Sequence, residues 1–117
     1  MSTIRDLVQA IARREGVDAI VVVGRDGLPI DWASGDGIDP EGVAALLPSV
    51  IRGMSDLGAA GARGEFATGV LEFGSGLAVV AVLHRDAMLV ILVRPETSIG
   101  TLLFDLRRHR TAIASLL

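Results

Sequence analysis

The chain has 117 residues, of which half are hydrophobic, and a formal net charge of −3. This length suits a single domain spanning residues 1–117, and the hydrophobic content excludes a disordered chain. The absence of cysteine and lysine excludes disulfides, zinc–thiolate sites, cysteine nucleophiles and Schiff-base lysines, and the negative charge argues against general nucleic-acid binding.

The N-terminal segment predicts an amphipathic helix. Its apolar residues recur at the spacing of one helical face: Ile4, Leu7, Val8 and Ile11. Ser2 or Thr3 can cap the start, and Gly16 is a stop signal. The segment lacks the apolar core of a signal peptide, and the longest apolar stretch, 87–93, is too short to cross a bilayer. The expectation is a cytoplasmic protein with no integral membrane association.

The next segment predicts a β-hairpin. The β-branched apolar run 19–23 reads as a buried strand, and residues 24–27 form a Gly-Arg-Asp-Gly turn. A second strand follows at 28–32. Because Pro29 cannot donate a ladder hydrogen bond, this second strand is predicted to lie at a sheet edge.

A long second helix begins at the cap Asp39 and ends in the glycine-containing stretch 58–61. One broad face is apolar: Val43, Leu46, Leu47, Val50, Ile51, Met54 and Leu57. A narrow stripe lies opposite: Glu41, Ala45, Ser49, Arg52 and Asp56. Pro48 interrupts the helix and is expected to bend it or fray its first turns.

Three strands and a helix complete the chain. The strands are predicted at 65–73, 77–83 and 88–93, with a tight loop at 74–76. Thr97 or Ser98 is expected to cap the last helix, whose apolar side is formed by Ile99, Leu102, Leu103, Leu106 and Ile113.

These elements predict an α+β fold. Short connections and the two most apolar strands at the centre give a five-stranded antiparallel sheet in the order 28–32, 19–23, 88–93, 77–83, 65–73. Helices cover both faces, which makes a three-layer α/β/α sandwich.

No motif indicates an enzyme. Gly24 and Gly27 could cradle a phosphate, but they join two strands instead of leading into a helix, which favours a hairpin turn. Ser34 and Ser75 lack the context of a nucleophile elbow. Asp36 and Asp39 are better explained by a turn and a helix cap than by acid–base chemistry. We therefore expect no catalytic residue and no cofactor.

Two further signals have simple structural explanations. The basic run 107–110, Arg-Arg-His-Arg, could bind nucleic acid or anionic lipid, but a solvated helix face is the preferred interpretation. His84 and His109 are far apart and lack metal-ligand spacing, so no metal site is expected.

The succession of elements resembles the roadblock/LC7 family. The resemblance rests on the hairpin sequence of residues 21–30, Val-Val-Val-Gly-Arg-Asp-Gly-Leu-Pro-Ile, and on the three-strand meander 64–93 with its Phe-Gly-Ser-Gly turn. Profilin-like and longin domains have related layouts, but the helix placement favours roadblock. Members of the family bind dynein intermediate chains, act as scaffolds for small GTPases or, in bacteria, regulate a Ras-like GTPase of the gliding-motility type.

The resemblance implies a homodimer in which the sheets join at the strand 65–73 and the second helices lie side by side. The implied dimer contacts are Met54, Leu57, Phe66, Thr68, Val70 and Glu72. The stripe of Glu41, Ala45, Ser49, Arg52 and Asp56 would then receive a partner protein.

The expected function is a homodimeric adaptor or regulator of a small Ras-like GTPase. No arginine is placed as a catalytic finger, so any stimulation of GTP hydrolysis would come from ordering the GTPase's own residues. A structural assembly module of the dynein light chain type is the alternative, and a small-ligand sensor or enzyme is a third hypothesis.

Overall fold

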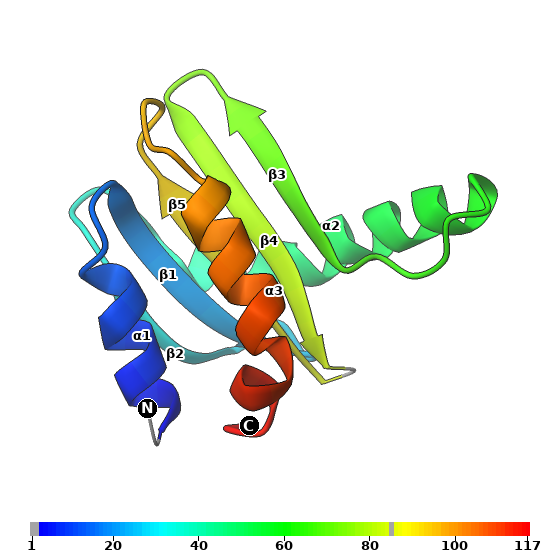
Figure 1. The fold of residues 1–117 in the computed structure, drawn as a ribbon, viewed down its shortest axis with the longest axis horizontal. Helices are drawn as coiled ribbons and strands as arrows, with labels where there is room; N and C mark the ends of the chain where they lie inside the picture. Colours follow the sequence, from blue (N-terminus) through cyan, green and yellow to red (C-terminus); the bar gives the residue numbers. More distant parts are fainter. Residues whose placement is uncertain (1–2, 85) are drawn as a thin grey trace.

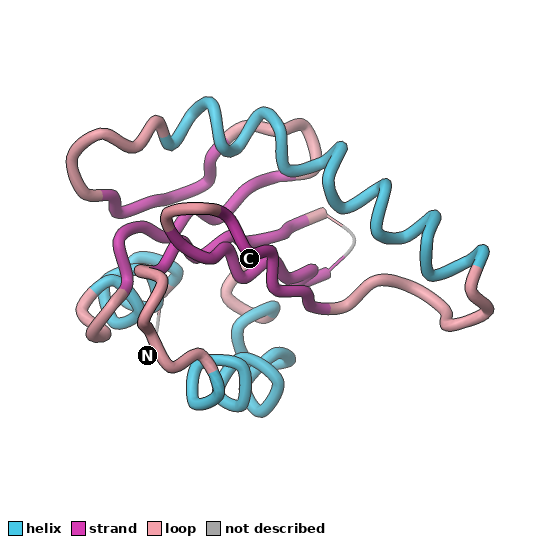
Figure 2. Tube along the Cα trace, turned by 90° about the horizontal axis from the view of Figure 1, so that it is seen from above, coloured by secondary structure: helices cyan, strands magenta, loops and turns pink. Residues whose placement is uncertain are grey.

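The computed structural model describes residues 3–84 and 86–117 and has the predicted order of elements (Figure 1). The elements are α1 (Ile4–Ala12), β1 (Val17–Gly24), β2 (Pro29–Ser34), α2 (Pro40–Ala60), β3 (Thr68–Phe73), β4 (Gly76–His84), β5 (Ala87–Val93) and α3 (Gly100–Ala114). Figure 2 shows α2 on one face of the sheet and the other two helices on the opposite face. The predicted three-layer α+β sandwich is therefore confirmed.

The five strands are antiparallel and have the predicted order β2-β1-β5-β4-β3. The Pro29-containing strand is at one edge, as predicted, because proline removes a backbone donor. A shift in the β1–β2 register between Val22 and Val23, opposite Pro29, accommodates the missing donor. The opposite edge strand is β3.

The sheet separates two apolar cores. The larger core packs α1 and α3 against alternate residues of the central strands, with Ile20, Leu89 and Ile91 completely buried. The smaller core lies under α2 and includes Val21 and Val90 from the sheet. Alternate side chains of one strand thus enter different cores, which explains why β1 and β5 are continuously apolar. No helix in the described ranges is long and apolar enough to cross a membrane.

Helix α2 is continuous through Pro48, so the predicted fraying of its first turns is wrong. Its N-cap is Asp39, as predicted, and the Gly42 N–H donates to Asp39 Oδ1 at 3.0 Å. Only Ala44 and Leu47 of this helix are fully buried. The C-terminal half passes beyond β3 and away from the sheet (Figures 1 and 2). The apolar arc predicted for this helix therefore exceeds what its own sheet covers.

Several element boundaries differ from the prediction. Strand β3 begins at Thr68 instead of residue 65, so Phe66 precedes the strand. Helix α1 starts after the predicted cap Thr3, whose hydroxyl accepts from the Asp6 N–H, but it ends at Ala12, before Gly16. The alternative cap Ser2 lies outside the described residues.

The predicted side-chain cap of α3 is wrong. The residue at the N-cap is Ile99, and no side chain caps this helix. The Thr97 hydroxyl instead donates to the Gly16 carbonyl oxygen at 3.5 Å. A tertiary contact with the loop after α1 has replaced the local capping interaction.

The end of α2 is a Schellman motif with an alanine where glycine is usual. The Arg63 N–H donates to the Gly58 carbonyl at 2.8 Å, and the Ala62 N–H donates to the Ala59 carbonyl at 3.1 Å. Ala62 has a φ of 55°, in the left-handed region. This conformation costs a residue with a Cβ about 1 kcal/mol relative to glycine.

Ala62→Gly is therefore expected to raise the free energy of unfolding by about 1 kcal/mol. Ala60→Gly is the matched control, because Ala60 is also exposed but lies in the right-handed last turn of α2. That control should lower the free energy of unfolding by roughly 0.5–1 kcal/mol. Urea denaturation at one fixed protein concentration measures both. Destabilisation by Ala62→Gly would contradict the assignment of strain to this residue.

Candidate protein-interaction surface

The outer edge of β3 offers unpaired backbone groups. The Val82 N–H donates to the Ala67 carbonyl at 3.0 Å, which fixes the hydrogen-bonding phase of the β3–β4 ladder. In an antiparallel pair the bonded residues alternate with residues whose backbone groups point away. The outward-pointing residues are therefore Thr68, Val70 and Glu72. All three belong to the predicted dimer contacts. Val70 and Thr68 pair with Val79 and Ala81 of β4, which belong to the core under α1 and α3, so the three side chains lie on that face of the sheet.

The β2 edge, in contrast, is partly closed by side chains, at Trp32. The Gly35 N–H donates to the Asp18 carbonyl at 2.9 Å, so alternation directs the backbone groups of Trp32 outward. The Trp32 N–H donates to Asp31 Oδ1 at 2.8 Å, and its carbonyl accepts from Arg5 Nη1 at 3.2 Å. Arg5 also pairs with Asp31 at 2.6 Å. The occupied backbone groups of Trp32 hinder strand pairing at the middle of this edge, whereas no described side chain occupies the outward groups of β3.

Exposed apolar side chains lie at the open edge and on α2. Phe73 at the end of β3 is 60% exposed, and the strand alternation places it on the same face as Leu71, which packs under α2. On α2, Leu46 and Leu57 are 68% and 66% exposed. They are 11 residues apart, or about three helical turns, and therefore lie on one side of the helix. Large exposed apolar side chains, such as Phe73 at the open strand edge and these two leucines on one side of α2, are typical of a protein interface.

The remaining predicted dimer contacts differ in their surroundings. Met54 is half-buried on α2. Phe66 packs across β3, because a Cβ placed on Gly69 would lie 3.1 Å from its ring. Phe66 thus belongs to the core under α2 and not to the strand edge. Leu46 and Phe73 are not among the interface candidates predicted from the sequence. The broad apolar face predicted for α2 was a signal for Leu46.

The predicted partner-binding stripe is exposed along its whole length. All five of its members are solvent-accessible: Glu41, Ala45, Ser49, Arg52 and Asp56. Among the described residues, Arg52 forms no ion pair. Its guanidinium is therefore available to a carboxylate or an aromatic ring of a partner.

The basic run 107–110 on α3 was predicted to be a solvated helix face, but it is only partly solvated. Arg107, Arg108 and His109 are exposed, but Arg110 is half-buried. Arg110 Nη1 donates to the Val82 carbonyl at 2.9 Å, and Nη2 donates to the Thr68 hydroxyl. Arg110 therefore connects α3 to the beginning of β3 and holds the open edge in place.

Two other predicted signals have structural roles. In the turn after β1, the Leu28 N–H donates to Asp26 Oδ1 at 3.0 Å and Gly27 has a φ of +82°, which confirms the hairpin-turn interpretation. His84 Nδ1 accepts from the Asp86 N–H at 3.0 Å in the β4–β5 turn. Within the described ranges, no group of three or more His, Cys, Asp or Glu side chains could hold a metal ion.

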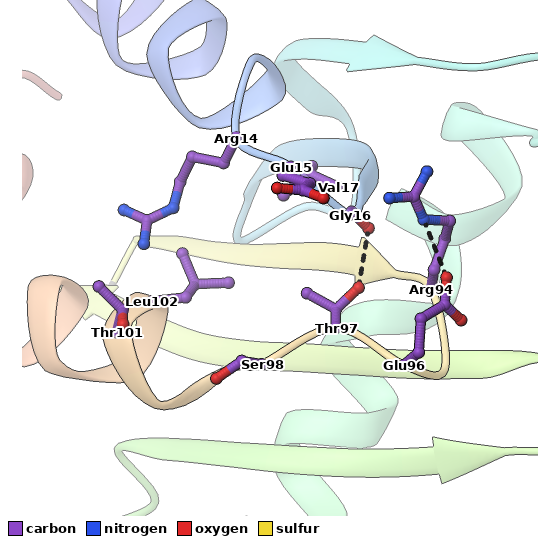
Figure 3. A pocket seen from close by; sticks show the side chains of 10 residues that line it. All are labelled: Arg14, Glu15, Gly16, Val17, Arg94, Glu96, Thr97, Ser98, Thr101 and Leu102. Carbon is purple, nitrogen blue, oxygen red and sulfur yellow. Dashed lines mark hydrogen bonds and ion pairs between the residues drawn. The ribbon is translucent and has the colours of Figure 1, made fainter.

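A pocket of about 500 Å³ lies between the loop after α1 and the loop before α3 (Figure 3). Its two arginines are engaged in ion pairs, Arg14 with Asp105 at 2.7 Å and Arg94 with the nearby Glu96 at 3.3 Å. Gly16 has a φ of +87°, and a Cβ there would lie 2.2 Å from Thr97 Oγ1. The pocket thus lies where the loop after α1 packs closely against the loop before α3.

The comparisons with known proteins give a consistent result. The model of the roadblock/LC7 domain matches residues 3–93. A roadblock/LC7 domain from Streptomyces avermitilis has a TM-score of 0.84 at 20% identity, and the match covers 97% of both chains. No curated protein matches the chain.

Two gliding-motility proteins also have this fold. MglB from Myxococcus xanthus has a TM-score of 0.83 at 16% identity, over 95% of this chain and 91% of MglB. The gliding protein MglB from Thermus thermophilus has a TM-score of 0.81 at 15% identity, over 96% of this chain and 86% of that protein. At these identities the structures show the fold, and the match of the family model to residues 3–93 establishes that the chain belongs to the roadblock/LC7 family.

Proposed function

We propose that this protein is a homodimeric, non-catalytic regulator that binds a small Ras-like GTPase in the cytoplasm. The observation that carries the proposal is a difference between the two sheet edges. On β2, Arg5 and Asp31 occupy the outward backbone groups of Trp32, whereas no described side chain occupies those of Thr68, Val70 and Glu72 on β3. Open strand edges in native proteins are normally paired or covered.

Joining two β3 strands about a two-fold axis would produce one continuous antiparallel sheet. Such an axis is perpendicular to the sheet, so both α2 helices would lie on the same face. The part of α2 that passes beyond β3 would then lie over the partner's sheet (Figures 1 and 2). Leu46, Leu57 and Phe73 would become buried, and the two polar stripes would form one composite surface.

The GTPase is the proposed occupant of this composite surface. The proposal is supported by the similarity in fold to the gliding-motility proteins and by the exposed Arg52 of the stripe, which forms no ion pair with another described residue. Stimulation of hydrolysis would come from ordering the switch residues of the GTPase, because an adaptor can accelerate hydrolysis without inserting an arginine of its own.

Two measurements test the proposal. Light scattering at micromolar concentration should give twice the 12.2 kDa chain mass, and a monomer across that range would refute the dimer. Affinity capture with GTP and GDP analogues, followed by titration of the captured GTPase, should show tighter binding of the GTP state. Equal binding of both states would instead support a passive assembly module of the dynein light chain type.

A further inference from the structure

We propose that the groove between α1 and α3 is a second docking site, and that it receives an acidic amphipathic helix of another protein. Figures 1 and 2 place both helices on the face of the sheet opposite α2. The groove between them has a volume of about 370 Å³. Its floor consists of buried apolar side chains: Leu7, Ile11, Leu102, Leu106 and Ile113.

The rims of the groove leave room for a close approach. Ala10 on α1 and Ala112 on α3 line the groove from opposite sides, and both are exposed. Small side chains allow a third helix to approach at the normal interaxial distance of roughly 8–10 Å. The Arg14–Asp105 ion pair belongs to the lining of the groove and connects α1 to α3. The apolar face of an incoming helix could therefore reach the floor between two fixed walls.

The net charge of the layer formed by α1 and α3 favours an acidic helix as the partner. Residues 3–16 and 99–117 contain six arginines and three acidic residues, a net charge of +3, whereas the rest of the chain contains five arginines and eleven acidic residues, a net charge of −6. Arg13 is three residues from the rim residue Ala10 and Arg108 is four residues from Ala112, so each lies about one helical turn from a rim residue. Both arginines are exposed, and neither forms an ion pair with another described residue. Carboxylates flanking an apolar stripe would complement both arginines.

This site would act independently of the β3 edge and α2. The groove lies on the opposite face of the sheet, and none of its lining residues belongs to β3 or α2. A homodimer would present two such grooves, so the protein could connect a partner on the α2 face to two acidic helices on the other face.

A designed peptide tests the site. The probe is a fluorescent helix of roughly 18 residues, long enough to fold in water, with leucine on one face and glutamate on the other. Its matched control has lysine at every glutamate position. We expect the full-length protein to bind the acidic peptide at least tenfold more tightly in an anisotropy titration. Amide shifts in an NMR titration should map to α1 and α3.

Two variants locate the binding. Arg13→Glu combined with Arg108→Glu should weaken acidic-peptide binding by tenfold or more, and Ala112→Trp should block the groove and do the same. The control combines Arg25→Glu with Arg63→Glu, which changes the net charge equally at exposed arginines outside the groove and should leave binding unchanged. Circular dichroism checks that each variant is folded.

Three outcomes would overturn the proposal. Equal affinity for the acidic and basic peptides would remove the role of charge, and unchanged affinity of both groove variants would place the site elsewhere. If the protein sediments with phosphatidylserine vesicles and binds the acidic and basic peptides equally, the basic face of α1 and α3 binds membrane surfaces and not an acidic helix.

Discussion

Replacing Val70 with proline is expected to convert the dimer into monomers. The Val70 N–H points out of the β3 edge, where the proposed partner strand would accept it. Proline removes this donor and its ring sterically opposes strand pairing. The donor is not used in the β3–β4 ladder, so the fold of each protomer should survive. Light scattering should therefore give a mass near 12.2 kDa, with near-wild-type circular dichroism.

Ser34→Pro is the matched control for this experiment. Ser34 occupies the corresponding outward phase on β2, as the Gly35–Asp18 hydrogen bond shows. If β3 forms the dimer, this control should remain dimeric. A dimer that dissociates with Ser34→Pro but not with Val70→Pro would show that the sheets join at the other edge.

Changing Arg52 to glutamate is expected to weaken binding of the GTP-loaded GTPase by tenfold or more, or about 1.4 kcal/mol. Arg52 is an exposed member of the α2 stripe, and the substitution inverts its charge without altering the core. Arginine often contributes strongly at interfaces, because its planar head both pairs and stacks. The free energy of unfolding should change by about 0.5 kcal/mol or less, as is usual for exposed positions.

The control for this prediction is Arg107→Glu, an identical charge change at an exposed residue of α3 on the opposite face. Titration of the GTPase in both nucleotide states compares wild type and the two variants. If Arg52→Glu binds as tightly as wild type, the α2 stripe is not the GTPase-binding surface. If both variants weaken binding equally, the effect is one of long-range charge and not of a contact.

The sequence by itself determined the elements and their order. Apolar periodicity is a local property: the i, i+3, i+4, i+7 spacing of α1 and the continuous apolar runs of β1 and β5 depend only on neighbouring residues. The edge position of Pro29 could also be predicted from a local property, because it follows from the missing backbone N–H of one residue. The strand order then followed from short connections, and the exposed stripe of α2 followed from its helical spacing.

The tertiary structure alone decided which contacts these elements make. Arg5 donates to the Asp31 carboxylate and the Trp32 carbonyl of β2, 26 and 27 residues away, and Arg110 donates to Thr68, 42 residues away. Thr97 bonds Gly16, 81 residues distant, instead of capping α3. Leu46 belongs to the same predicted apolar face of α2 as the core residue Leu47, yet Leu46 is exposed. Periodicity assigns a residue to a face, but burial and hydrogen bonding depend on which distant segment covers that face, and that is fixed only when the layers pack.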